Sequence, residues 1–344
     1  MILLQAFSLG AALSFLLCFP VRECLSRWKV VDLPNNRSSH GRPTVRGGGI
    51  AILAAAFVAG VSFLPGKGVG VPAWVAASAA ALAVVSFIDD VRSLPQSLRF
   101  GVQALSALTF LAALSLCDSQ GASISAQLTW MALGFTWITG YTNAFNFMDG
   151  INGLAGLQLV VTGVGTALIG IRAGALPTNS AVVISIVLAG AGLGFLPHNF
   201  PRAKMFLGDV GSAPIGFLLA AIAFWLARDF GWWLLGAFGL IHANFVADTA
   251  LTLARRFSKG ERWSEPHREH YYQKLVRSGK SHEFVTGMEV LAQFIVIIVV
   301  LAAEPRNWII RGASVFIVGA IWWAFFAYAQ YEFDRAAPPE QRTA

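Results

Sequence analysis

Charged residues are scarce in this chain of 344 residues: Asp, Glu, Lys and Arg make up 12% of it, whereas a soluble domain carries about 25%. The hydrophobic residues, 56% of the total, gather in long runs that are almost free of charge. This composition excludes an ordinary soluble domain, because runs of about 20 apolar residues predict membrane-spanning helices. A closed barrel would show short segments of alternating polarity instead.

Cysteine is nearly absent as well. Cys18, Cys24 and Cys117 are odd in number and scattered, which argues against a disulfide framework and against a cysteine metal site. We expect them to pack between helices. Lys and Arg are missing ahead of the first apolar run, "MILLQAFSLG", so this run is predicted to be a retained span and not a cleavable signal peptide.

The apolar runs predict an all-α polytopic membrane protein with about eleven transmembrane helices in one domain, residues 1–329, followed by a short polar tail, 330–344. The run 70–88 is alanine-rich and the run 231–252 contains His242 and Asp248, so these two are the weakest. The predicted spans are 2–20, 47–65, 70–88, 100–117, 127–145, 153–171, 180–197, 211–227, 231–252, 286–303 and 308–329.

The positive charge is distributed unevenly between the two sides of the predicted bundle. Twenty of the 25 Lys and Arg residues fall in one set of alternate loops and in the tail. The positive-inside rule places that set in the cytoplasm, with the N-terminus outside and the C-terminus inside. We attribute the net charge of +7 to an anionic leaflet and anionic substrates and not to nucleic acid. The cytoplasmic loops are 21–46, 89–99, 146–152, 198–210 and 253–285.

Four aspartates are predicted at the cytoplasmic ends of the spans: Asp89, Asp90, Asp149 and Asp209. Carboxylates beside a membrane are costly and tend to be functional. Four at one depth can converge on Mg²⁺, which takes few protein oxygens and completes its shell with substrate phosphates. For the adjacent pair alone, a solvated helix end is the alternative interpretation.

The string "NAFNFMDGINGLAG", residues 143–156, joins two apolar runs. Asn143, Asn146 and Asp149 are spaced by three and would share a face of a continuing helix, where amides can bind a metal, a base or a sugar. A polar helix end is the alternative, and it explains only part of the string. "FLGDVGS" likewise sets Asp209 at the start of a span, where amides favour phosphate. Arg46 opens "RGGGI", which indicates either a phosphate site or helix packing.

His267 and His270 lie in the most basic loop, with Arg268 between them. The spacing alone is compatible with a metal site, but no cysteine and no further well-placed histidine accompanies it. A basic clamp for pyrophosphate is the favoured interpretation. For His242 and Asp248, inside a predicted span, structural pairing and a cavity-facing role both remain open.

These motifs together resemble the polyprenyl-phosphate N-acetylhexosamine-1-phosphate transferases, glycosyltransferase family 4. The string 143–156 is similar to that family's Asn-x-x-Asn-Phe-x-Asp-Gly-x-x-Gly-Leu, and "DD", "GDVGS" and a His-rich fifth cytoplasmic loop come in the family's order. "RSSHGRPTVRGGG" and "HREHYYQKL" look most like the bacterial branch that initiates O-antigen and other surface polysaccharides. The last loop departs from the triple-histidine form of the muramoyl-pentapeptide branch.

The resemblance implies transfer of an N-acetyl-sugar 1-phosphate from a UDP-sugar to undecaprenyl phosphate, with release of UMP, at the inner membrane of a bacterium. It implies Mg²⁺, with Mn²⁺ as the alternative, on Asn146 and Asp209. Further roles implied by the resemblance are activation of the lipid phosphate by Asp89 and Asp90, a uracil contact by Asn152, a basic residue at Arg99, and pyrophosphate or sugar contacts by His267, Arg268 and His270.

Two rival functions remain to be weighed: a peptidoglycan enzyme of the phospho-N-acetylmuramoyl-pentapeptide transferase type, and a lipid flippase or secondary transporter. Transporters place their sites near the bilayer midplane at broken helices, often with internal repeats. Here the charged residues cluster at one face and no repeat is seen. The sequence does not identify the donor sugar, and it leaves a homodimer among the oligomeric states.

Overall fold

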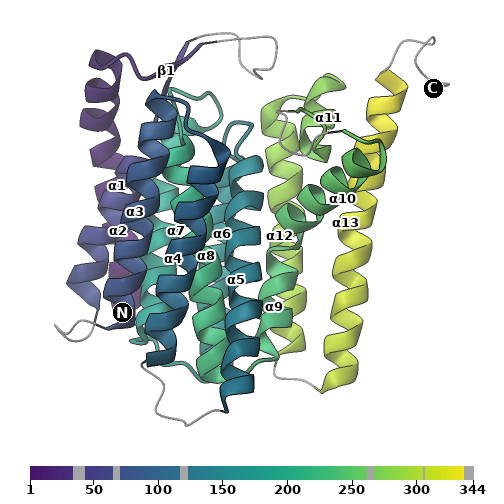
Figure 1. The fold of residues 1–344 in the computed structure, drawn as a ribbon. Coiled ribbons are helices and arrows are strands. Elements are labelled where there is room, and N and C mark those ends of the chain that lie inside the picture. The colour runs from purple at the N-terminus through teal and green to yellow at the C-terminus, as the bar shows by residue number, and fades with distance from the viewer. Residues whose placement is uncertain (34–42, 65–69, 117–122, 262–266, 305–306, 337–344) are drawn as a thin grey trace.

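The computed structural model describes residues 1–33, 43–64, 70–116, 123–261, 267–304 and 307–336. Long helices stand side by side in a bundle (Figure 1), so the predicted all-α polytopic membrane fold is confirmed. The long helices are α1 (Ile2–Arg27), α3 (Val71–Val91), α4 (Gln96–Leu116), α5 (Ile124–Phe147), α6 (Leu154–Arg172), α7 (Ser180–Asn199), α8 (Asp209–Phe230), α12 (His282–Ala303) and α13 (Trp308–Ala336).

Every predicted span coincides with helical structure, but not every helix is a full apolar span. Among the described residues, eight helices are long and apolar enough to cross a membrane, and a bent pair can make a ninth. The helix α2 (Gly49–Phe63) has only 15 residues. The helix α5 has 24 residues but is not one of these eight helices.

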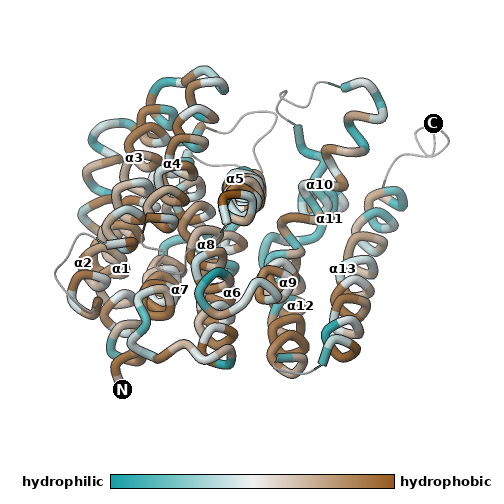
Figure 2. The backbone as a smooth tube through the Cα atoms, turned by 60° about the horizontal axis from the view of Figure 1, so that its bottom comes forward, coloured by the Kyte–Doolittle hydropathy of each residue, from teal (hydrophilic) through white to brown (hydrophobic). Residues whose placement is uncertain are grey.

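The predicted span 231–252 is not one straight helix. It is split into α9 (Leu234–Ile241) and α10 (Ala243–Ser258), which meet at His242 with a bend of 73°. Beyond the bend, buried polar side chains bind partners on other elements: Asn244 bonds to Gln158 of α6 at 2.9 Å. Figure 2 shows this polar character of α10 and of the short helix α11 (Tyr271–Arg277) against the brown apolar helices.

The helix α8 forms the centre of the bundle, and the stretch of it that would span a membrane is entirely buried. A helix that is apolar all round is expected to be covered on every side. At its start it touches α2 without side chains between them, because a Cβ on Gly49 would lie 2.0 Å from Cα of Gly211. The amides of Gly48 and Gly49 donate to the carbonyls of Phe206 and Leu207. "RGGGI" therefore serves close packing, the alternative to phosphate binding.

A small three-stranded sheet, which the sequence does not predict, lies at one end of the bundle. Its strands are β1 (Val31–Asp32), β2 (Thr44–Arg46) and β3 (Met205–Phe206), in the order β1-β2-β3. The strands β2 and β3 are parallel, with Arg46 opposite Phe206. This pairing carries Arg46 to the start of α8.

The predicted polar tail, 330–344, begins later than expected. Residues up to Ala336 continue α13, because Gln330 and Glu332 bond to lysines of the neighbouring loop and helix. Residues 337–344 lie outside the described part of the chain.

Candidate active site

The end of α3 meets the start of α8 through the side chain of Asp90. Gly208 is the N-cap of α8 and gives that helix no side-chain cap of its own. The Asp90 carboxylate supplies one: Oδ1 accepts from the amide of Asp209 at 3.1 Å, and Oδ2 accepts from the amide of Val210 at 2.9 Å. Negative charge is favourable at a helix N-terminus, where the amides lack partners. With its side chain 0% exposed, Asp90 holds Asp209 in place.

Two arginines stand between the carboxylates. Arg46 pairs through Nε with Asp90 at 2.8 Å and through Nη2 with Asp209 at 2.7 Å. Arg99, in the first turn of α4, pairs with Asp89 at 2.8 Å and lies 3.8 Å from Asp209. Burial alone would lower the pKa of Arg46, but the carboxylates of Asp209 and Asp90 outweigh it and the pKa is raised. Asp209 is thus flanked by two guanidinium groups.

The last turns of α5 reach the same place. The Oδ1 atom of Asn146 accepts a hydrogen bond from the hydroxyl of Ser212, in the first turn of α8. One turn earlier, Nδ2 of Asn143 donates to Gln103 of α4 at 2.9 Å. Both asparagines line one cavity, since residues three apart on a helix share a face.

Asp149 and Asn152, beyond the end of α5, do not line that cavity. Desolvation raises the pKa of Asp149 well above its usual range, Asp209 raises it further, and Arg46 acts against both. Asn152 contacts other segments: its Nδ2 donates to the carbonyl of Pro201 at 3.0 Å, and its carbonyl accepts from Thr286 at 2.9 Å.

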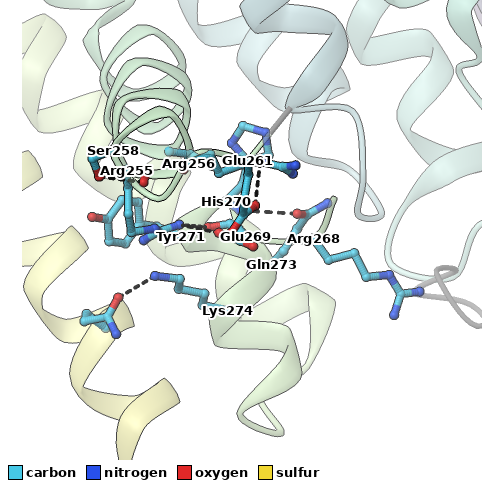
Figure 3. A network of polar contacts seen from close by, with 12 residues as sticks. Arg255, Arg256, Ser258, Glu261, Arg268, Glu269, His270, Tyr271, Gln273 and Lys274 are labelled. Carbon is cyan, nitrogen blue, oxygen red and sulfur yellow. Dashed lines mark hydrogen bonds and ion pairs between the residues drawn. The ribbon is translucent and has the colours of Figure 1, made fainter. Parts of the chain in front are cut away.

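The loop before α11 forms the opposite wall. His267 and His270 both line the cavity, with ring centroids 5.0 Å apart. Burial, together with His270 and Arg256, lowers the pKa of His267 to about 4. At pH 7 the His267 ring is neutral, so it offers hydrogen bonds and not charge. The side chain of Arg268 extends away from His270 (Figure 3) and does not line the cavity.

The helix α11 and the loop before it are anchored to three neighbouring helices. The hydroxyl of Tyr272 donates to the last carbonyl of α5 at 3.0 Å. Arg255 of α10 donates to the carbonyl of Glu269 at 2.8 Å, and Lys274 donates to Gln330 of α13 (Figure 3). The two histidines are thereby fixed relative to the end of α5.

These elements enclose a cavity of about 370 Å³. Sequence reasoning missed four of its polar residues, all of them uncharged: Ser86, Gln96, Gln103 and Gln273. Of the predicted site residues, the wall contains Asp89, Arg99, Asn143, Asn146, Asp209, His267 and His270. The remaining predicted residues do not line it: Arg46, Asp90, Asp149, Asn152 and Arg268. Its apolar walls are Leu82, Val85, Phe100, Phe147 and Ala213.

The oxygen atoms of Asp89, Asn146 and Asp209 that line the cavity are of the kind that bind hard cations. Among the described residues, no three His, Cys, Asp or Glu side chains meet as a metal-binding group, because guanidinium groups stand between the carboxylates. Asp89, Asp209 and Asn146 nevertheless all present oxygen atoms. Mg²⁺ is bound in this way, by one or two carboxylates with substrate phosphates completing its shell.

Comparison with known proteins connects this geometry to a family. Residues 72–227, from the start of α3 into the last turn of α8, match the family described as Glycosyl transferase family 4. A decaprenyl-phosphate N-acetylglucosaminephosphotransferase of Mycobacterium tuberculosis is 32% identical over 312 residues, which cover 80% of this chain and 76% of the relative. The chain belongs to glycosyl transferase family 4. The resemblance seen in its motifs is confirmed.

Two further relatives of this family 4 protein are named for different activities. A probable undecaprenyl-phosphate N-acetylglucosaminyl 1-phosphate transferase of Bacillus subtilis is 29% identical over 285 residues, covering 77% of this chain and 75% of the relative. A phospho-N-acetylmuramoyl-pentapeptide-transferase of Streptococcus uberis is 26% identical over 255 residues, covering 67% and 74%. The family match contains the α3 carboxylates, the string 143–156 and Asp209, whereas Arg46 and the two cavity histidines lie outside it.

Proposed function

We propose that this protein transfers an N-acetylhexosamine 1-phosphate from a UDP-sugar to a polyprenyl phosphate, in the first instance undecaprenyl phosphate. An oxygen of the lipid phosphate attacks the β-phosphorus of the donor, and the bond from that phosphorus to UMP breaks. The observation that supports this proposal is the cavity at one end of the bundle, where Asp89, Asp209, Asn146 and Arg99 face one another. The M. tuberculosis and B. subtilis relatives are named as N-acetylglucosamine-phosphate transferases, which favours UDP-N-acetylglucosamine as donor.

Mg²⁺, or Mn²⁺ in its place, would be held by Asp209 and Asn146. Bound there, the cation offsets the repulsion between the two phosphate groups that must approach each other. Arg46 and Asp90 do not touch the substrates in this proposal. They fix the position of Asp209, one through its carboxylate and the other through its amide.

Arg99 is the cavity cation that would hold a phosphate oxygen, because its guanidinium faces the cavity while Asp89 orients it. We propose a positioning role for Asp89, whose two oxygens accept from Arg99 at 2.8 Å and from the amide of Leu94 at 2.7 Å. A phosphate monoester has a second pKa near ~6. The acceptor is therefore already ionised at neutral pH and needs little activation by a base.

The cavity would face the cytoplasm of a bacterial inner membrane, as the excess of Lys and Arg in the loops on that side requires. The product would initiate a surface polysaccharide of the O-antigen type. A phospho-N-acetylmuramoyl-pentapeptide donor is the second candidate, favoured by the S. uberis relative. Its lower identity ranks it after the N-acetylglucosamine donor.

UMP release by the purified protein in detergent tests the proposal. The assay contains undecaprenyl phosphate, Mg²⁺ and a panel of UDP-N-acetyl sugars. We expect release that requires both lipid and metal, and Asp209→Asn should lower it on the order of 100-fold or more, as loss of a group that stabilises transition-state charge does. The matched control is Asp229→Asn, an exposed aspartate at the opposite end of the same helix, which should retain activity. Equal activity of the two variants would refute the role of Asp209.

A further inference from the structure

A second buried carboxylate, Asp248 of α10, lies behind the cavity wall. Its side chain is 1% exposed. Oδ1 lies 2.9 Å from Nδ1 of His270, and Oδ2 accepts from the amides of Tyr271 at 2.9 Å and Tyr272 at 3.4 Å. The hydroxyl of Thr252, one turn along α10, donates to Oδ1 at 3.2 Å. The partners that the structure gives this carboxylate are thus the start of α11, one histidine and Thr252 of its own helix.

These contacts determine which ring nitrogen of His270 carries the proton and which is left to face the cavity. A carboxylate can only accept, so the proton of a neutral His270 is held on Nδ1. Nε2 lies on the opposite edge of the ring, and His270 forms part of the cavity wall. The ring packs against Phe147, with centroids 6.0 Å apart, and against Tyr272, at 5.9 Å. His270 is thus fixed in both tautomer and orientation.

We propose that Asp248 is a positioning residue of the active site, which holds His270 so that Nε2 meets the diphosphate of the bound nucleotide sugar. This inference rests on the proposed function. When Nε2 takes a second proton, the Asp248 carboxylate balances the charge of the ring, as the carboxylate of a catalytic triad does. The Nε2–H group then donates to a phosphate oxygen. Asp248 itself touches no substrate.

The competing interpretation is that Asp248 only caps α11. Asp248→Asn separates the two possibilities, because the amides of Tyr271 and Tyr272 still need the oxygen of the new side chain. Its NH₂ group is then left facing Nδ1 of His270, which must accept. The neutral ring then carries its proton on Nε2 and has no carboxylate beside Nδ1 to balance a second proton. It can offer the diphosphate a neutral hydrogen bond but not a positive charge, while the cap of α11 is kept.

The first test is a double-mutant cycle on kcat/KM for the UDP-sugar, with folding followed by thermal unfolding in detergent. We expect Asp248→Asn to lower kcat/KM on the order of 10- to 100-fold, the range found for partners that orient a functional histidine. In a His270→Gln background the same change should cost less than about threefold, because residues that act as a unit are not additive. Equal losses in both backgrounds, or no loss, would overturn the proposal.

Glu289→Gln is the matched control. Glu289 is another buried carboxylate of the same region, bonded to Asn244 at 3.2 Å, and the structure gives it no contact with His270. Its conversion to the amide should leave kcat/KM within about twofold. A loss as large as that of Asp248→Asn would assign the effect to the replacement of any buried carboxyl group in this region and overturn the proposal.

The second test does not depend on turnover. In ¹⁵N-histidine-labelled protein, the His270 signals are assigned by their loss in His270→Gln. We expect Nδ1 to carry the proton in the unchanged protein and Nε2 to carry it in Asp248→Asn. The same tautomer in both would refute the positioning role. Absence of UMP release by the unchanged protein with every donor would instead refute the proposed function.

Discussion

Because the first turns of α2 and α8 are in direct contact, adding one methyl group at Gly49 is expected to lower both stability and activity strongly. In Gly49→Ala the new Cβ would lie 2.0 Å from Cα and 2.5 Å from N of Gly211. Both atoms belong to the backbone, so no side chain can rotate away. The helices must separate by roughly 1 Å or more, and overpacking of this kind costs about 1–3 kcal/mol.

The same displacement reaches the cavity. Asp209 is the first residue of α8, two positions before Gly211, and a misplacement of about 1 Å near reacting groups can lower a rate on the order of 100-fold. We therefore expect Gly49→Ala to lose far more UMP release than its loss of stability explains. Thermal unfolding and turnover are to be measured on the same detergent-purified sample.

Gly60→Ala is the matched control, since it makes the same change on the same helix. A Cβ on Gly60 would meet no atom of the described residues within 4 Å, its own helix backbone aside. Alanine is favoured over glycine in a helix by about 1 kcal/mol, so this variant should be as stable as the unchanged protein or slightly more so, and fully active. If Gly49→Ala matches Gly60→Ala in melting temperature and turnover, the close approach of α2 and α8 is not what holds Asp209.

Two further variants test the loops. Asn152→Ala should weaken UMP binding about tenfold if its amide bonds uracil, and unchanged affinity in a calorimetric titration would remove it from the nucleotide site. Burial lowers the pKa of Lys274 to about 8, against an ordinary value of 10.5. Between these pH values the unfolded chain binds more protons, so stability rises with pH. The unchanged protein should gain melting temperature relative to Lys274→Met between pH 7.5 and 9.5, and a constant difference would contradict the shift.

The helices could be predicted from the sequence because an apolar run is a local signal. The gathering of Asp89, Asp90 and Asp209 at one end followed from counting spans. The different roles of Asp89 and Asp90 could not be predicted in this way. The two residues are neighbours in sequence and differ only in their contacts, Asp90 with amides of α8 and Asp89 with Arg99. One of the partners that the structure gives Asp90 is an amide group 119 residues away, and no short motif records such a contact.

The same limit applies to the sheet and to the broken span. Strands of two or three residues are too short to show alternation, so the parallel pairing that brings Arg46 to Asp209, 163 residues away, leaves no pattern. His242 and Asp248 were recognisable as unusual inside an apolar run. The bend at His242 and the bond from Asp248 to His270 depend on the direction in which α10 leaves α9. A stretch of sequence the length of one helix carries no information about that direction.

The contact between Asp90 and the start of α8 can form only after α8 has been synthesised. Asp90 leaves the ribosome 119 residues before the amide it binds, an interval of roughly 6 to 24 seconds at 5–20 residues per second. During that time the carboxylate of Asp90 at the end of α3 lacks the amides of α8 that it binds in the folded protein. A chain that stalls before α8 would hold several inserted helices and no active site, so insertion of α8 is the step at which a nascent transferase becomes distinguishable from a set of spans.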